Sequence, residues 1–131
     1  MEINTIHSPY ALLKTLPLKN VTLRDGFWSG RQAINREKSL KHAYKKLEDS
    51  GNFNNLRLAI GSGVGEYRKP VFMDTDIYKW LEAASYELVN HPDPVLDAMA
   101  DEAIDLLGAA QQEDGYLNSY FQVVEPEKKW Q

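Results

Sequence analysis

Acidic, amide and tyrosyl side chains gather in two short stretches of this sequence. The first stretch carries Asp74 and Asp76, and the second carries Gln112, Asp114 and Tyr116. Carboxylates, amides and phenols that converge on one surface bind polar, hydroxylated ligands through hydrogen bonds. The two aspartates are two residues apart, so their side chains diverge on a helix, and they do not form an acid/base dyad.

Each of these residues also has a structural explanation, and both explanations stay open at this point. An aspartate at the start of a helix is more often an N-cap than a catalytic acid. Asp114 followed by Gly115 is typical of a turn. The neighbouring aromatic residues are either a platform on which a sugar stacks or, more commonly for such side chains, part of the packed core. These aromatic residues are Tyr116, Tyr120 and Phe121.

Metal-binding and nucleophilic chemistry have little support in the composition. The sequence contains no cysteine, which excludes disulfides, thiol nucleophiles and thiolate ligands within this chain. His7, His42 and His91 are scattered, with no pair at i,i+4 spacing, which argues against a zinc site built from this chain alone. The glycines at 61–65 lack the preceding strand and the following Lys-Ser/Thr of a phosphate-binding loop. We therefore predict no metal or catalytic residue here.

Two helices joined by a tight corner must position the polar stretches. Residues 74–90 are apolar on nearly all sides, which predicts a buried helix, whereas residues 94–111 carry one apolar stripe. Asp93 is placed to cap the later helix, and Pro94 suits its first position. Antiparallel packing puts the start of the first helix beside the end of the second. We therefore expect the polar side chains to share one rim, with the His-Pro-Asp-Pro corner at the opposite end.

The segments before these two helices are predicted to form an extended arm and one long helix. Residues 1–28 form an extended arm that contains a short β-prone run at 21–23. Phe27 and Trp28 follow a turn signal, and large aromatics in such a place are expected to anchor a segment onto a core. Apolar residues at helical spacing predict a long helix over 29–49. The domain prediction is therefore an arm over 1–28 and a helical domain over 29–131.

Composition narrows the class of protein. The chain has 131 residues, 43% of them hydrophobic and 26% charged, with a net charge of −4. This suits one globular domain and gives no electrostatic attraction to nucleic acid or anionic lipid. No apolar run approaches the roughly 18 residues of a membrane span, and the N-terminus lacks the pattern of a secretory signal. We expect a cytoplasmic protein without a nucleic-acid or membrane partner.

Several motifs, in order along the chain, resemble glycoside hydrolase family 127, the β-L-arabinofuranosidase-like proteins. The pattern F-x-D-[ST]-D-x-Y-K-W-L-E-A occupies residues 72–83, H-P-D-P occupies 91–94, and A-Q-Q-x-D-G-Y-L occupies 110–117. The run at 21–28 and the segment at 55–61 match the family's earlier segments. The resemblance covers most of the chain from Val21 onward.

This resemblance implies a fold and an activity. Family members have an (α/α)6-barrel catalytic domain followed by β-sandwich domains, in a chain several times longer than this one. The fold expected here is all-α: the first helices of an (α/α)6 barrel, preceded by a short extended or β segment, with residues 29–131 as part of the barrel. The activity implied is hydrolysis of terminal β-L-arabinofuranosyl or related glycosides.

The resemblance also implies which residues shape a sugar site. The positions that match the family motifs are predicted to bind substrate, and they are Asn55, Phe72, Asp74, Asp76, Gln112, Asp114 and Tyr116. In the family a zinc-bound cysteine is the proposed nucleophile, with a glutamate among the metal ligands, and these lie downstream of the matched region. Zinc is therefore expected only in the full-length family, a carbohydrate is the expected partner there, and this chain alone is predicted to lack hydrolase activity.

Two other functions stay open. The chain could be a small helical interaction module that docks a partner, or a second copy of itself, through the apolar surface of residues 77–89. It could also be another (α/α)6 sugar enzyme, such as an epimerase or an unsaturated glucuronyl hydrolase. The motifs of those enzymes are not recognised in this sequence.

Overall fold

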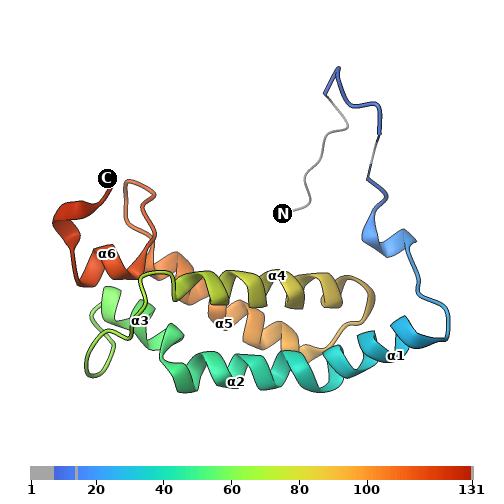
Figure 1. Cartoon of the computed structure of the whole chain (residues 1–131), viewed down its shortest axis with the longest axis horizontal. Helices are drawn as coiled ribbons and strands as arrows, with labels where there is room; N and C mark the ends of the chain where they lie inside the picture. The colour runs from blue at the N-terminus through green and yellow to red at the C-terminus, as the bar shows by residue number, and fades with distance from the viewer. Residues whose placement is uncertain (1–7, 14, 131) are drawn as a thin grey trace.

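Helices account for all regular secondary structure in the described part of the chain. The computed structural model describes residues 8–13 and 15–130, and within them the prediction of an all-α fold is confirmed (Figure 1). The elements are, in chain order, η1 (Leu18–Asn20), α1 (Phe27–Ile34), η2 (Asn35–Ser39), α2 (Leu40–Ser50), α3 (Asn52–Ala59), α4 (Asp74–Asn90), α5 (Pro94–Ala110), α6 (Ser119–Val123) and η3 (Pro126–Lys128).

The first long helix is continuous from α1 to α2. It contains a π-helical segment, η2, and it extends slightly beyond the predicted range of 29–49 at both ends. It ends at Gly51, whose φ of 90° is in the left-handed region that glycine adopts without steric cost. This conformation turns the chain directly into α3, at the same end of the molecule as the start of α4 (Figure 1).

The predicted hairpin is formed by α4 and α5. The bounds of α4 match the prediction, and α5 ends one residue before the predicted Gln111. Asp93 caps α5 as expected, because its Oδ1 accepts hydrogen bonds from the backbone N–H groups of Val95 at 2.9 Å and Leu96 at 3.2 Å. In Figure 1, α4 runs antiparallel to both α2 and α5, and α5 is seen between the other two helices.

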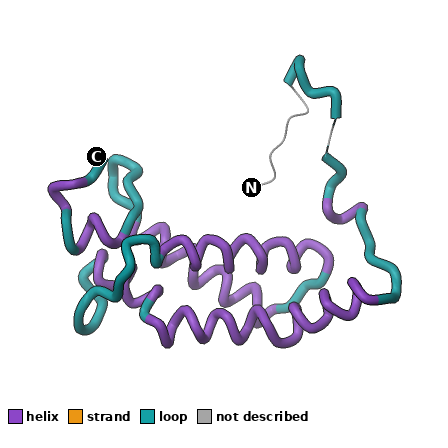
Figure 2. The backbone as a smooth tube through the Cα atoms, in the orientation of Figure 1, coloured by secondary structure: helices purple, strands orange, loops and turns teal. Residues whose placement is uncertain are grey.

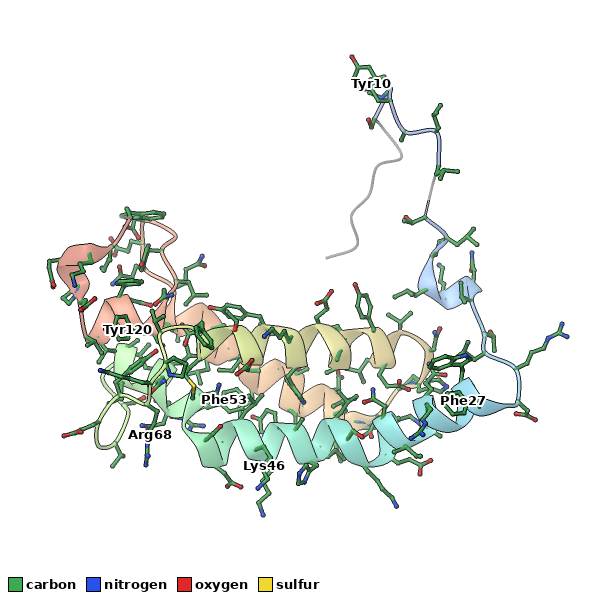
Figure 3. All side chains as sticks on the ribbon, in the orientation of Figure 1. Tyr10, Phe27, Lys46, Phe53, Arg68 and Tyr120 are labelled. Carbon is green, nitrogen blue, oxygen red and sulfur yellow. The ribbon has the colours of Figure 1, made fainter. Side chains whose placement is uncertain are left out.

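One hydrophobic core joins α2, α3, α4 and α5. Trp80 is central to it, since its ring packs on Tyr44 and its Nε1–H donates a 2.9 Å hydrogen bond to the carbonyl of Leu40. Figure 3 shows Phe53 among these helices, and its ring also packs against Tyr44. The remaining buried members of this core are Leu40, Leu47, Leu56, Ile77, Ala84, Leu96, Ala103 and Ala110.

The prediction that Phe27 and Trp28 anchor the chain onto the core is wrong. Their side chains are 66% and 69% exposed, and their rings contact each other with centroids 5.0 Å apart. The physical reason is their position. Both belong to the first turn of α1, at the far end of the molecule from α3 and α6, where none of the described elements buries them (Figure 1). Figure 3 shows Phe27 at this end.

The N-terminal arm leaves the helical body (Figure 2). The prediction of extended backbone is confirmed at Val21, with φ of −114° and ψ of 117°. No strand forms at residues 21–23, because the described part of the chain offers no neighbouring strand to share backbone hydrogen bonds. Residues 1–7 and 14 of the predicted arm lie outside the described residues. No described helix has the length and apolar character needed to cross a membrane.

Candidate functional site

Polar side chains converge at the end of the molecule where α4 begins and α5 ends. We call this end the rim, and define it as Asp74, residues 111–118 and α6 (Figure 1). The antiparallel hairpin produces it, because the first turn of α4 and the last turn of α5 lie at the same level. The rim contains four of the seven residues predicted to bind substrate.

Asp74 is buried and supports the rim through hydrogen bonds. Its side chain is 2% exposed, and its Oδ2 accepts a 2.6 Å hydrogen bond from the backbone N–H of Ser119. The Ser119 hydroxyl donates to Asp74 Oδ1, so the Tyr67 hydroxyl, 3.2 Å away, donates to Ser119 Oγ. Asp74 does not cap its own helix. It instead holds the first residue of α6 in place.

Two tyrosines near Asp74 stay protonated at neutral pH. Burial raises the pKa of Tyr78 to about 12, and the charge of Asp74 acts in the same direction. Burial is also the main cause that raises the pKa of Tyr67, although its hydrogen bond to Ser119 opposes the shift. These phenols are therefore hydrogen-bond donors and acceptors, and they are unsuited to serve as general bases at neutral pH.

Asp76 faces a different surface. It forms a 3.2 Å ion pair with Lys79 and lines a cavity of about 570 Å³ between α2 and α4, together with Trp80. The divergence expected from the two-residue spacing is confirmed, since Asp74 points to α6 and Asp76 to the α2–α4 groove. The structure therefore does not bring Asp76 together with the rim residues.

The loop after α5 is a tight, hydrogen-bonded turn. The Gly115 N–H donates to the Gln112 carbonyl at 2.8 Å, and the Gln112 N–H donates to the Tyr116 carbonyl at 2.9 Å. The Asp114 carboxylate accepts the Tyr116 N–H at 3.0 Å, and Gly115 has a φ of 85°. The expected Asp-Gly turn is confirmed. It presents the side chains of Gln112, Asp114 and Tyr116 from a preorganised backbone.

The aromatic residues of the rim form two groups of ring contacts. Tyr120 contacts Tyr67 and Phe121 with ring centroids 5.5 and 5.2 Å apart, and all three side chains are half-buried. Tyr116 instead contacts Trp130, with centroids 4.7 Å apart. The α6 aromatics thus contribute to packing, whereas the Tyr116 group lies toward the surface.

Two other predicted site residues lie behind the rim. Asn55 is fully buried in α3, where its Oδ1 accepts the N–H of Arg68 and its Nδ2 donates to the carbonyl of Arg68, both at 2.8 Å. Asn55 therefore supports the 60–73 segment from inside the fold. Phe72 is 60% exposed just before α4. Direct contact of either residue with a sugar stays a prediction.

Charged and polar side chains contact one another at the far end of the hairpin. Buried Glu87 lies between Arg36 and His91, with its Oε1 3.3 Å from Arg36 Nη1 and 2.7 Å from His91 Nδ1. Lys41 Nζ lies 2.7 Å from Asp93, and this hydrogen bond is the main cause that lowers the pKa of Asp93. These contacts agree with the interpretation of the His-Pro-Asp-Pro stretch as a structural corner.

The described residues do not fit a zinc ion of the kind that the resemblance implies. Among residues 8–13 and 15–130, no group of three or more His, Asp or Glu side chains is placed to hold a metal. The rim supplies hydrogen-bond donors, acceptors and aromatic faces, which are suited to binding a hydroxylated ligand.

A match to the model of a protein family shows which family this chain belongs to. The model for the β-L-arabinofuranosidase GH127 catalytic domain matches residues 20–131, and so includes the rim and the corner. The chain belongs to glycoside hydrolase family 127.

Individual members of family 127 support this assignment. The chain is 36% identical to a non-reducing end β-L-arabinofuranosidase from Bifidobacterium longum subsp. longum, over 79% of the chain. It superposes on a crystal structure of a GH127 β-L-arabinofuranosidase from Geobacillus stearothermophilus T6 with a TM-score of 0.81, at 42% identity over 85% of the chain. A second GH127 β-arabinofuranosidase structure gives a TM-score of 0.74 at 33% identity. The prediction of a helical N-terminal part of a family-127 barrel is confirmed.

The chain spans about a fifth of the length of these family-127 proteins. It covers 19% of the Bifidobacterium relative, and 19% and 17% of the two solved structures. The matched part is therefore the first helices of a larger family-127 catalytic domain.

Two residues that support the rim were not predicted from the sequence. Ser119 and Tyr67 complete the hydrogen-bonded chain to Asp74, and neither belongs to the motifs used for the prediction. A signal for Ser119 was available, since Asn118 is a favoured N-cap residue and its Oδ1 accepts the N–H of Phe121 at 3.2 Å. Tyr67 had no such signal, because its position depends on how the 60–73 segment packs.

Proposed function

We propose that this chain forms the N-terminal part of a glycosidase acting on β-L-arabinofuranosyl or related glycosides, and that its rim is one wall of the sugar site. The observation that carries the proposal is the family-127 match over residues 20–131. The hydrogen-bonded turn after α5, which presents polar side chains at the rim, supports the location. The ends of paired helices are where αα architectures build ligand sites from facing side chains.

The predicted substrate-binding residues have different tasks in this proposal. Gln112, Asp114 and Tyr116 present side chains from the preorganised turn, and they contact sugar hydroxyls or ring faces. Asp74 and Asn55 act from inside the fold by holding the rim and the 60–73 segment, as their burial and hydrogen bonds indicate.

Bond cleavage is assigned to residues outside this chain. Glycoside hydrolysis needs an acid and a nucleophile or base at a set separation, and the rim offers no such pair among the residues that the structure describes. Asp74 is fully engaged with Ser119, and Asp76 faces the α2–α4 groove. In this proposal, zinc and the cysteine and glutamate side chains that would bind it belong to the full-length protein. We also propose a cytoplasmic location for the protein.

The direct test is an assay of the purified chain on an aryl β-L-arabinofuranoside, with and without added zinc. In either condition we expect a hydrolysis rate no higher than that of buffer without protein. Zinc-dependent turnover that a chelator abolishes would overturn the assignment of the chemistry to residues outside the chain. Circular dichroism of the same sample controls for folding, since helical content must be present for a negative result to count.

Self-association is a second candidate property, favoured by one observation. Tyr86 and Val89, near the end of α4, are 46% and 49% exposed, although the remainder of the 77–89 surface is largely covered by α2, α3 and α5. A second copy of the chain, or further helices of the barrel, would cover this surface. The chain would act as an independent interaction module only if it is stable when neither a second copy nor further helices cover this surface.

A further inference from the structure

Trp130 is a large aromatic side chain held at the edge of the rim and left open to solvent. It is 72% exposed, and its ring packs edge-on against Tyr116 with centroids 4.7 Å apart. The two rings meet at a steep angle of 72°, and most of the indole surface stays accessible. Exposed aromatic rings beside polar groups are typical of sites that bind the apolar faces of hydroxylated ligands.

The backbone holds Trp130 in an uncommon conformation. Its φ of 66° lies in the left-handed region, and among the described residues it is the one non-glycine with a positive φ. A bulky residue adopts this conformation at an energetic cost, which local contacts must offset. The contact with Tyr116 is one such interaction, and it joins Trp130 to the turn after α5.

Polar groups surround this ring pair. Lys129 lies with its Nζ 5.5 Å from the centre of the Tyr116 ring, and it also donates a hydrogen bond to Gln112 Oε1. Gln112 thereby connects the Trp130 segment to a residue of the predicted sugar site. The arrangement combines an exposed aromatic surface, an ammonium group and an amide within one small area.

The net negative charge of the residues around Trp130 favours a neutral ligand over an acidic one. Residues 111–130 carry four carboxylates (Glu113, Asp114, Glu125 and Glu127) against two lysines (Lys128 and Lys129). Lys128 is also paired with Glu125 at 2.9 Å. A surface with excess negative charge repels an acidic sugar and accepts a neutral one.

From these observations we infer that Trp130, supported by Tyr116 and Lys129, is a stacking platform for neutral sugar rings at the edge of the rim. The inference rests on the proposed function, because it deepens the assignment of the rim to sugar binding. The net negative charge of residues 111–130 favours uncharged glycosides over uronates on this platform. Neither Trp130 nor Lys129 is among the residues predicted to bind substrate from the sequence.

The chain carries its own control for this inference. Trp28 is also exposed, at 69%, and it also packs edge-on against an aromatic ring, with centroids 5.0 Å from Phe27. It lies in α1, at the opposite end of the molecule from α6. Trp80 is buried and hydrogen-bonded to Leu40, and it serves as an internal reference.

The experiment follows the three indole N–H signals of the ¹⁵N-labelled chain by NMR during titration with methyl β-L-arabinofuranoside. We expect the Trp130 signal to shift with saturation in roughly the millimolar range, as for one weak contact surface. The Trp28 and Trp80 signals stay in place. Equal shifts of Trp28 and Trp130, or no shift of Trp130 with any neutral sugar, would overturn the platform.

Variants and other sugars separate this inference from the proposed function. Trp130→Ala is expected to weaken binding, measured at the Gly115 amide, by about three- to tenfold, whereas Trp130→Phe retains most of it. If the Gly115 amide responds to the furanoside while Trp130 does not, the platform is wrong and the proposed function stands. If Trp130 responds only to a neutral hexopyranoside, the platform stands and the proposed substrate is wrong. An equal response to galacturonate contradicts the selection by charge.

Discussion

At the scale of single residues, Asp74 is the position where structure changes the interpretation most. Both of its oxygens are used by Ser119, and it is 2% exposed. We predict that Asp74→Ala lowers the free energy of unfolding by about 2–4 kcal/mol, because a buried N–H and a hydroxyl lose their acceptor. Urea denaturation followed by circular dichroism measures this change.

Asp76→Ala is the matched control for that prediction. Asp76 lies in the same helical turn, but its one pairing among the described residues is a surface ion pair with Lys79. Such pairs contribute little, so the expected change is within about 0.5 kcal/mol. Equal losses for the two variants would mean that Asp74 does not hold α6 as described.

Tyr78 gives the fold a testable dependence on alkaline pH. Burial and Asp74 raise its pKa to about 12 in the folded state, above the ordinary value of 10.0. A raised pKa favours the protonated folded form, so its contribution to stability is complete below pH 10 and is lost as the pH rises toward 12. We predict that Tyr78→Phe makes stability less dependent on pH in this window, as measured by urea denaturation at several pH values. A variant with the unchanged pH dependence of the parent would contradict this cause.

The sequence identified polar residues of the rim, but it did not distinguish those that face solvent from those that support the fold. Asp74 and Asn55 match family motifs as well as Asp114 does, yet both are buried. Motif position carries no information on side-chain burial. The partners that decide it, Ser119 and Arg68, are 45 and 13 residues away in sequence.

At the scale of elements, asparagines of α3 hold the irregular 60–73 segment. Asn55 bonds the N–H and the carbonyl of Arg68, and Asn54 does the same for Val64, at 3.0 and 2.9 Å. The Asn55 hydrogen bonds are half-buried and the Asn54 hydrogen bonds are exposed. We predict that Asn55→Ala destabilises the chain by about 2–3 kcal/mol and Asn54→Ala by less than about 1 kcal/mol, because water replaces only the exposed partners.

Thermal denaturation and hydrogen exchange at residues 60–73 would measure both effects. Faster exchange at the Arg68 amide in Asn55→Ala is the expected local signature. Similar losses from the two variants would show that burial does not decide the strength of these contacts.

Most helices were predictable because their signals are local. Asp93, Pro94 and the apolar spacing define α5 without reference to any other segment. The exposure of Phe27 and Trp28 was not predictable, since burial depends on which neighbours surround a residue. The π-helical segment η2 and the short helix α6 also escaped prediction, because the former has the composition of an ordinary helix and the latter depends on Asp74 for its start.

At the scale of the whole molecule, the exposed end of α4 predicts reversible self-association. Val89→Lys is expected to shift the mass measured by light scattering toward that of a monomer at high concentration, since a charge there opposes burial of the surface. Val64→Lys is the matched control, because Val64 is 81% exposed and lies in the 60–73 segment before α4, outside the surface of residues 77–89. A parent chain that is monomeric at all concentrations would contradict the prediction.

The central claim is that the rim binds sugar and the opposite corner does not. Mapping of backbone amide shifts during titration with methyl β-L-arabinofuranoside tests it most directly. The predicted result is a saturable shift at residues 112–116, with no change at residues 91–94. Shifts that are centred on the corner, or absent from the rim at saturating sugar, would contradict the account.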